Sequence, residues 1–157
     1  MKIIRSLEAE FARLHGRSVA LVRAVSPDQL YRQPEGSGGL LAASCGEHLL
    51  RSAASVEQTF GGITVNLWDD PFEWTLPEAL PTPEYIIEYL AEAEATRQRG
   101  FALLQSDEDL AREIATPSGE MRTLFQLISE TLVRASHHQG RAFATFRLFS
   151  DARLPLV

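Results

Sequence analysis

Apolar residues recur at steps of three and four along most of this chain, which is the spacing of one face of an α-helix. In the first segment these positions are Ile4, Leu7, Phe11, Leu14, Leu21, Val22 and Val25. Charged residues such as Arg5 and Glu8 lie between them. The pattern predicts one amphipathic helix of about six turns at the start of the chain.

The same spacing, joined to helix-start signals, predicts three further helices. A capping box at 44–47 (Ser-Cys-Gly-Glu) begins a helix that runs to Phe60, where Gly61-Gly62 is expected to end it. The sequence Thr-Pro-Glu at 82–84 begins a helix through Leu104, and a capping box at 123–126 begins the last helix, to Phe149. The inward positions are Cys45, Leu49, Ser52, Val56 and Phe60 in the second helix and Leu124, Ile128, Thr131, Ala135, His138, Ala142, Thr145 and Phe149 in the last.

The segments between these helices are short or irregular, with one long exception. Ser26, Pro27 and Gln29 indicate a new capped turn, residues 34–39 a glycine-rich loop, and residues 106–112 one more turn. The long connection at 61–81 carries Trp68 and Trp74, and it is either a lid or a loop anchored by its aromatic rings. With no strand pattern, residues 1–157 are predicted to form one all-α domain, an up-down four-helix bundle.

Composition and charge narrow the class of protein. The chain has 157 residues, 45% of them apolar, and a formal net charge of −6. This acidic balance argues against a nucleic-acid-binding protein, which needs a basic surface. No apolar run is long enough to span a membrane, no signal peptide is recognisable, and the single cysteine, Cys45, has no disulfide partner. We therefore expect a cytoplasmic protein in which Cys45 is a buried, inert thiol.

Polar residues on the second and last helices are the candidates for chemistry. His138 lies on the apolar stripe of the last helix, and Arg134 precedes it by one turn. In the second helix Glu47 precedes Arg51 by one turn, with His48 beside it. An inward histidine in a bundle is either a metal ligand or a core residue that hydrogen-bonds a neighbour.

Two short motifs, Ser44-x-x-Glu47-x-x-x-Arg51 and Arg134-x-x-His137-His138-x-Gly140, resemble those of the DinB-like (YfiT-like) helical bundles. The order of helices agrees, and the resemblance covers residues 3–149. It implies the four-helix fold, a homodimer, and a nickel or zinc ion held by three histidines for hydrolysis or low-molecular-weight-thiol transfer. Ile3, Val19 and Phe143 are expected to be exposed and compatible with a dimer.

This sequence departs from the family pattern at the metal site. Positions 51 and 134, where the family carries ligands, are arginines, and only His138 matches. A guanidinium has no free lone pair and repels a cation, so the three-histidine site is expected to be lost and no cofactor is expected. A displaced nickel or zinc site built from His48, His138 and a carboxylate is the alternative, with His137 a weaker candidate.

The two arginines have two possible uses. With His138, His48 and Glu47 they suit a small carboxylate or phosphorylated ligand, because a guanidinium binds such an anion through two hydrogen bonds. Alternatively they form ion pairs with Glu47 and Glu130, each one turn before its arginine. The sequence favours a metal-free small-molecule or anion-binding protein over a metal-dependent enzyme, and a structural dimeric module without pocket chemistry is the third hypothesis.

Overall fold

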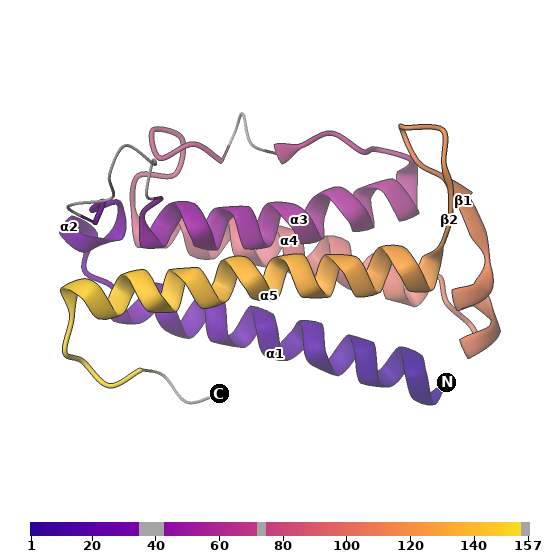
Figure 1. Cartoon of the computed structure of the whole chain (residues 1–157), viewed down its shortest axis with the longest axis horizontal. Coiled ribbons are helices and arrows are strands. Elements are labelled where there is room, and N and C mark those ends of the chain that lie inside the picture. The colour runs from indigo at the N-terminus through magenta and orange to yellow at the C-terminus, as the bar shows by residue number, and fades with distance from the viewer. Residues whose placement is uncertain (35–42, 72–74, 155–157) are drawn as a thin grey trace.

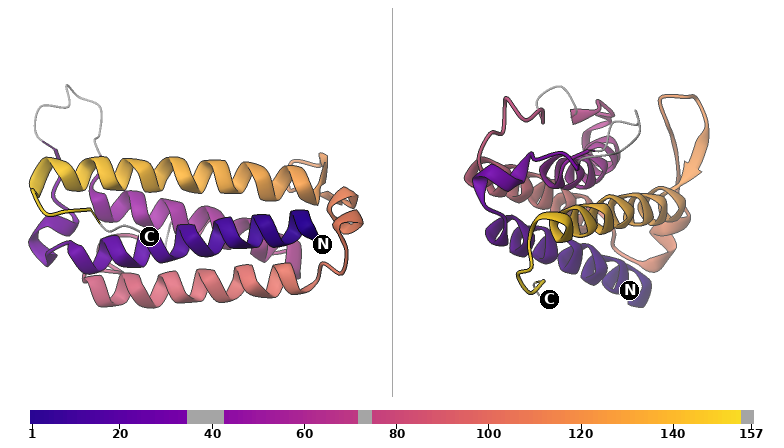
Figure 2. Two further views of the ribbon diagram at one scale, coloured as in Figure 1. Left: turned by 90° about the horizontal axis from the view of Figure 1, so that it is seen from below. Right: turned by 60° about the vertical axis from the view of Figure 1, so that its left-hand side comes forward.

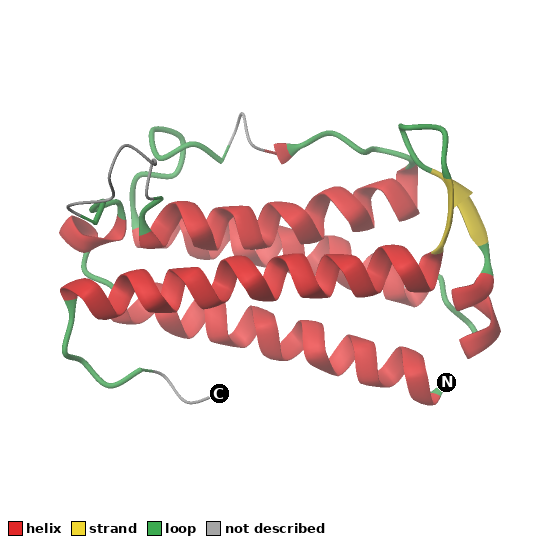
Figure 3. Cartoon of the chain, in the orientation of Figure 1, coloured by secondary structure: helices red, strands yellow, loops and turns green. Residues whose placement is uncertain are grey.

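The computed structural model describes residues 1–34, 43–71 and 75–154. Its long helices are α1 (Lys2–Ala24), α3 (Cys45–Val65), α4 (Pro83–Ala102) and α5 (Leu124–Phe149). The shorter elements are α2 (Pro27–Leu30), the 3-10 helix η2 (Asp107–Ala111), β1 (Glu113–Ala115) and β2 (Met121–Thr123). The long helices pack side by side (Figure 1) and a small hairpin lies at one end (Figure 3), so the all-α prediction is confirmed.

The direction of α4 differs from the up-down order expected from the sequence. Leu21 near the end of α1 packs in one cluster with Leu49 and Ile86, which lie near the starts of α3 and α4. At the other end Phe60 and Phe101 have ring centroids 5.2 Å apart. Helices α3 and α4 are therefore parallel to each other and antiparallel to α1, while α5 again runs with α1 (Figure 2).

The long connection explains this order. Residues 66–82 join the end of α3 to the start of α4. A helix of 21 residues, such as α3, is about 30 Å long. Because an extended chain covers about 3.3 Å per residue, 17 residues are enough to return along the whole helix. The expected up-down order is wrong, because α4 begins at the same end of the bundle as α3.

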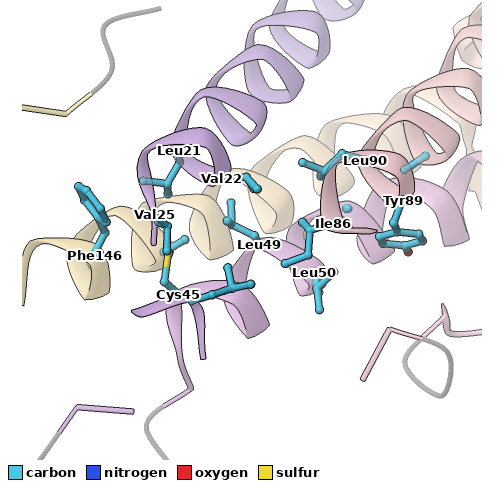
Figure 4. Close-up of a cluster of buried hydrophobic side chains, with 14 residues drawn as sticks. Leu21, Val22, Val25, Cys45, Leu49, Leu50, Ile86, Tyr89, Leu90 and Phe146 are labelled. Carbon is cyan, nitrogen blue, oxygen red and sulfur yellow. The ribbon is translucent and has the colours of Figure 1, made fainter. Parts of the chain in front are cut away.

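The core consists of two clusters, one toward each end of the bundle. Figure 4 shows the first, in which side chains from α1, α3, α4 and α5 pack together, with Cys45 among them. The second contains Phe60 and Phe101, together with Phe11 from α1. Burial raises the pKa of the Cys45 thiol to about 12, which fits the expected inert thiol. Among the described residues no helix is apolar over enough of its length to cross a membrane.

The glycine pair in α3 has a role other than the expected helix stop. The helix continues through Gly61 and Gly62 to Val65, and Asn66 ends it in the left-handed conformation with φ 56°. A Cβ atom on Gly62 would lie under 3.0 Å from the ring of Trp68. The two glycines therefore let the following segment fold back onto α3, and Trp68 is anchored there.

Two of the three expected capping boxes are present. Ser44 with Glu47, and Thr123 with Gln126, each form both reciprocal hydrogen bonds. The turn predicted at Ser26 forms as α2, with Ser26 at its N-cap and Pro27 in its first turn, but its capping box does not form. The Gln29 side chain donates instead to the carbonyl of Phe149 at 2.9 Å. That bond ties α2 to the end of α5.

Several smaller expectations change in three dimensions. The turn expected at 106–112 is η2, but the β1–β2 hairpin that follows was missed because strands of three residues are too short to show alternation. Ile3 is 49% exposed, whereas Val19 and Phe143 are partly buried against the core, so they do not form the expected exposed surface. The glycine-rich loop beyond Pro34, and Trp74 of the aromatic segment, lie outside the described residues.

Candidate functional site

The site candidates lie along the contact between α3 and α5. The two helices are antiparallel, and Ser52 of α3 donates a hydrogen bond to the carbonyl of Ala135 in α5 at 2.8 Å. Residues three or four apart share one helix face, so His48 and Arg51 point the same way from α3, as do Arg134 and His138 from α5. The packing of these two helices therefore brings both motifs together.

The centre of the site is a pair of imidazole rings. The ring centroids of His48 and His138 are 6.1 Å apart, with 30° between the ring planes. His48 is only 8% exposed and His138 is half-buried. The Nδ1 atoms of both rings are buried and have no hydrogen-bond partner among the described residues. An unsatisfied buried polar atom is costly, so this pair calls for a functional explanation.

Both imidazoles are neutral near pH 7. Burial is the largest cause of the lowered pKa of His48, and the positive charges of Arg141 and Arg51 lower it further. Burial, the neighbouring His48 and the charge of Arg51 lower the pKa of His138 to about 4. The positive potential at the rings therefore comes from the arginines.

A hollow of about 390 Å³ opens over these rings. Its polar lining comes from His48 and Arg51 of α3 and from His138, Arg141 and Thr145 of α5. Arg51 and Arg141 are exposed at its mouth. No aspartate or glutamate is among the residues that the structure places in its lining. The hollow thus combines two cations with two neutral imidazoles.

A second hollow of about 170 Å³ shares Arg51 and His138 with the first. It adds Arg134 from α5, Gln58 from α3, and Asp70 from the segment that follows α3. The three residues predicted to act together, Arg51, Arg134 and His138, do line one surface hollow. Arg134, however, shares its hollow with the carboxylate of Asp70, whereas the larger hollow has Arg141 and no carboxylate in its described lining.

The two carboxylates that were expected to pair with the site arginines make other contacts. Glu47 accepts hydrogen bonds from the backbone N–H and the hydroxyl of Ser44, both at 2.7 Å, as part of the helix cap. Glu130 pairs with Arg122 of β2. The arginine that is buried with a carboxylate partner is Arg97 of α4, bonded to Glu94 at 2.6 Å and 2.8 Å.

The remaining candidates are less central. His137 is exposed and belongs to the lining of neither hollow. Glu47 likewise contributes to neither lining. In the part of the chain that the structure describes, no group of three His, Cys, Asp or Glu side chains is placed to hold a metal ion. His48 and His138 are two potential donors of the displaced metal site.

Arg141 is the functional candidate that the sequence analysis missed. It follows His138 by three residues and Arg134 by seven, which places all three on one face of α5. This spacing was readable in the sequence, but a family motif that ends at Gly140 directs attention away from it. Only the position of α3 shows that Arg141 and Arg51 border the same hollow.

Comparisons with models of protein families, with curated proteins and with solved structures find no match to this chain.

Proposed function

We propose that the larger hollow binds a small anion such as a carboxylate or a phosphate monoester, without a metal. The observation that carries this proposal is that Arg51 and Arg141 line one hollow together with His48 and His138, with no carboxylate in the described lining. Guanidinium groups bind such anions through paired hydrogen bonds, and a neutral imidazole can donate one more.

The energy favours an anion over a cation at this place. A unit charge about 4 Å from one guanidinium interacts by about 4 kcal/mol at an effective dielectric constant near 20. Because Arg51 and Arg141 are exposed, solvent reduces the net contribution of each to about 1 kcal/mol. Two such contacts attract an anion by the same amount that they repel a metal ion.

Binding of inorganic phosphate and of citrate, measured by calorimetry at pH 7.5 and low salt, tests the proposal. Arg51→Gln and Arg141→Gln are each expected to weaken binding by about fivefold, and 0.5 M salt to weaken it further. Arg99→Gln is the matched control, because Arg99 is exposed on α4, bonds Thr96 of its own helix, and is outside the described linings of both hollows. Equal binding by all three variants would contradict the proposal.

A displaced divalent-metal site is the second candidate, and the His48–His138 pair favours it. Rings with centroids 6.1 Å apart can both reach one ion with bonds of about 2 Å. Such a site would open the route to metal-dependent hydrolysis or thiol transfer. Elemental analysis of the purified chain distinguishes the two functions, because stoichiometric nickel or zinc would favour the metal site over the metal-free anion site.

We also propose that the chain is a DinB-like bundle that forms a homodimer. The long-helix architecture and the two motifs on α3 and α5 support this. The double variant Arg51→His, Arg134→His returns imidazoles to the positions that the family uses, so it is expected to gain binding of one nickel or zinc ion. Failure to gain an ion would count against the alignment of these motifs. Sedimentation of the wild-type chain tests the dimer.

A further inference from the structure

The two hollows on α3 and α5 differ in charge although they share residues. The larger has Arg51 and Arg141 and no carboxylate in its described lining, whereas the smaller has Arg134 together with Asp70. Arg51 and His138 belong to both. One ligand lying over these two shared side chains would therefore meet positive charge at one end and charges of both signs at the other.

Asp70 is held at the smaller hollow by its own segment. Gln58 of α3 donates a hydrogen bond to the carbonyl of Trp68 at 3.0 Å. The ring of Trp68 lies against Gly62, where a Cβ atom could not fit. These two contacts fix the chain beside α3 two residues before Asp70. The carboxylate is thus placed by packing against the helix that carries Arg51.

We infer that the ligand is an acidic α-amino acid, or a small compound that ends in one, and this inference rests on the proposed anion-binding function. The side-chain acid lies in the larger hollow with Arg51 and Arg141. The α-carboxylate lies against Arg134, and the α-ammonium donates to Asp70. A carboxylate can accept several hydrogen bonds at once, so Asp70 can bind the ammonium while keeping its contacts within the protein.

The span of the site suits a short ligand. Arg134 and Arg141 are seven residues apart on α5, which corresponds to about 10 Å along the helix axis. Both have long side chains that can bend toward Arg51, which lies across from them on α3. A ligand with two acidic groups separated by a few carbon atoms can therefore contact both ends through the shared centre.

Two probes that differ only in the ammonium group test the inference. Glutarate and L-glutamate carry the same two carboxylates, but glutarate has the larger net negative charge, so a site that only attracts negative charge prefers glutarate. We expect the wild-type chain to bind L-glutamate about fivefold more tightly than glutarate at pH 7.5. Asp70→Asn is expected to abolish that preference, while Asp69→Asn, at the exposed neighbouring position outside both hollows, retains it.

Each outcome separates this inference from the function on which it rests. If Asp70 only neutralises the arginines, Asp70→Asn raises the affinity for both probes by the same factor, and the inference is wrong. If both probes bind equally and neither variant changes their ratio, the anion site stands and the amino-acid ligand is wrong. If neither these probes nor phosphate nor citrate binds, the proposed anion-binding function itself fails.

Discussion

Replacing glycine by alanine is expected to change the free energy of unfolding differently at two positions in the long helices. Gly100 of α4 lies against the ring of Phe60 in α3, and a Cβ atom there would be under 3.0 Å from the ring. Phe60 cannot move away easily, because it is fully buried and packs on Phe11 at 5.3 Å and on Phe101 at 5.2 Å. At Gly140 of α5, no atom of the described residues outside the local helix backbone lies within 4 Å of the same ideal position.

The magnitudes follow from two competing terms. Replacing glycine by alanine inside a helix stabilises the folded state by about 1 kcal/mol. Overpacking a well-packed core costs about 1–3 kcal/mol. Gly140→Ala has only the first term, so it is expected to raise the free energy of unfolding by about 1 kcal/mol. At Gly100 both terms apply, so the gain is cancelled or exceeded and the variant is expected to lose up to about 2 kcal/mol relative to wild type.

Urea unfolding followed by circular dichroism at 222 nm measures both variants in one series. In thermal unfolding of a chain of this size, a change of about 1 kcal/mol in the free energy of unfolding shifts Tm by about 2–4 °C. A Gly100→Ala variant that is stabilised by about 1 kcal/mol, as expected for Gly140→Ala, would refute the close approach of α3 and α4 at Phe60. A destabilising Gly140→Ala would mean that another surface covers this face of α5. A dependence of that loss on protein concentration would then point to a second copy of the chain.

Two further predictions concern the site and its helix. The pKa of His138 is about 4 in the folded protein but near 6.5 in the unfolded chain. Between these pH values the unfolded state binds one more proton than the folded state. The free energy of unfolding should therefore fall as the pH drops from about 6.5 to 4. After allowance for solvent screening the loss is about 1–2 kcal/mol, and urea midpoints for His138→Asn should depend less on pH. Ser44→Ala removes the N-cap hydrogen bond of α3 and should lower the free energy of unfolding by about 1 kcal/mol. The control is Ser136→Ala, at an exposed position within α5, which should leave the free energy of unfolding nearly unchanged.

Local features of the sequence were enough to predict the helices. The capping boxes at Ser44 and Thr123 form as expected, because their hydrogen bonds join residues only three positions apart. The apolar stripes are buried, since a helix places residues three and four apart on one face. That periodicity also places His138, Arg134 and Arg141 on one face of α5 without knowledge of any other helix.

The three-dimensional structure decided how those faces meet. The long return of residues 66–82 makes α4 parallel to α3, and no local spacing specifies how far a loop travels before the next helix begins. Glu47 and Glu130 lie one turn from arginines in sequence, but the first caps its own helix and the second pairs with Arg122. Side chains have several partners within reach, and packing between distant segments selects among them.

At the candidate site, the contribution of the sequence and that of the tertiary structure can be separated residue by residue. The sequence by itself determined which residues of α3 and α5 share a face, because helical periodicity is a local property. Tertiary structure decided that Arg51 and Arg141 line one hollow with two neutral imidazoles, and that Asp70 and Arg134 line the adjoining hollow. Those neighbours come from different elements, so their distances and the lowered pKa values of the histidines arise only when the helices pack.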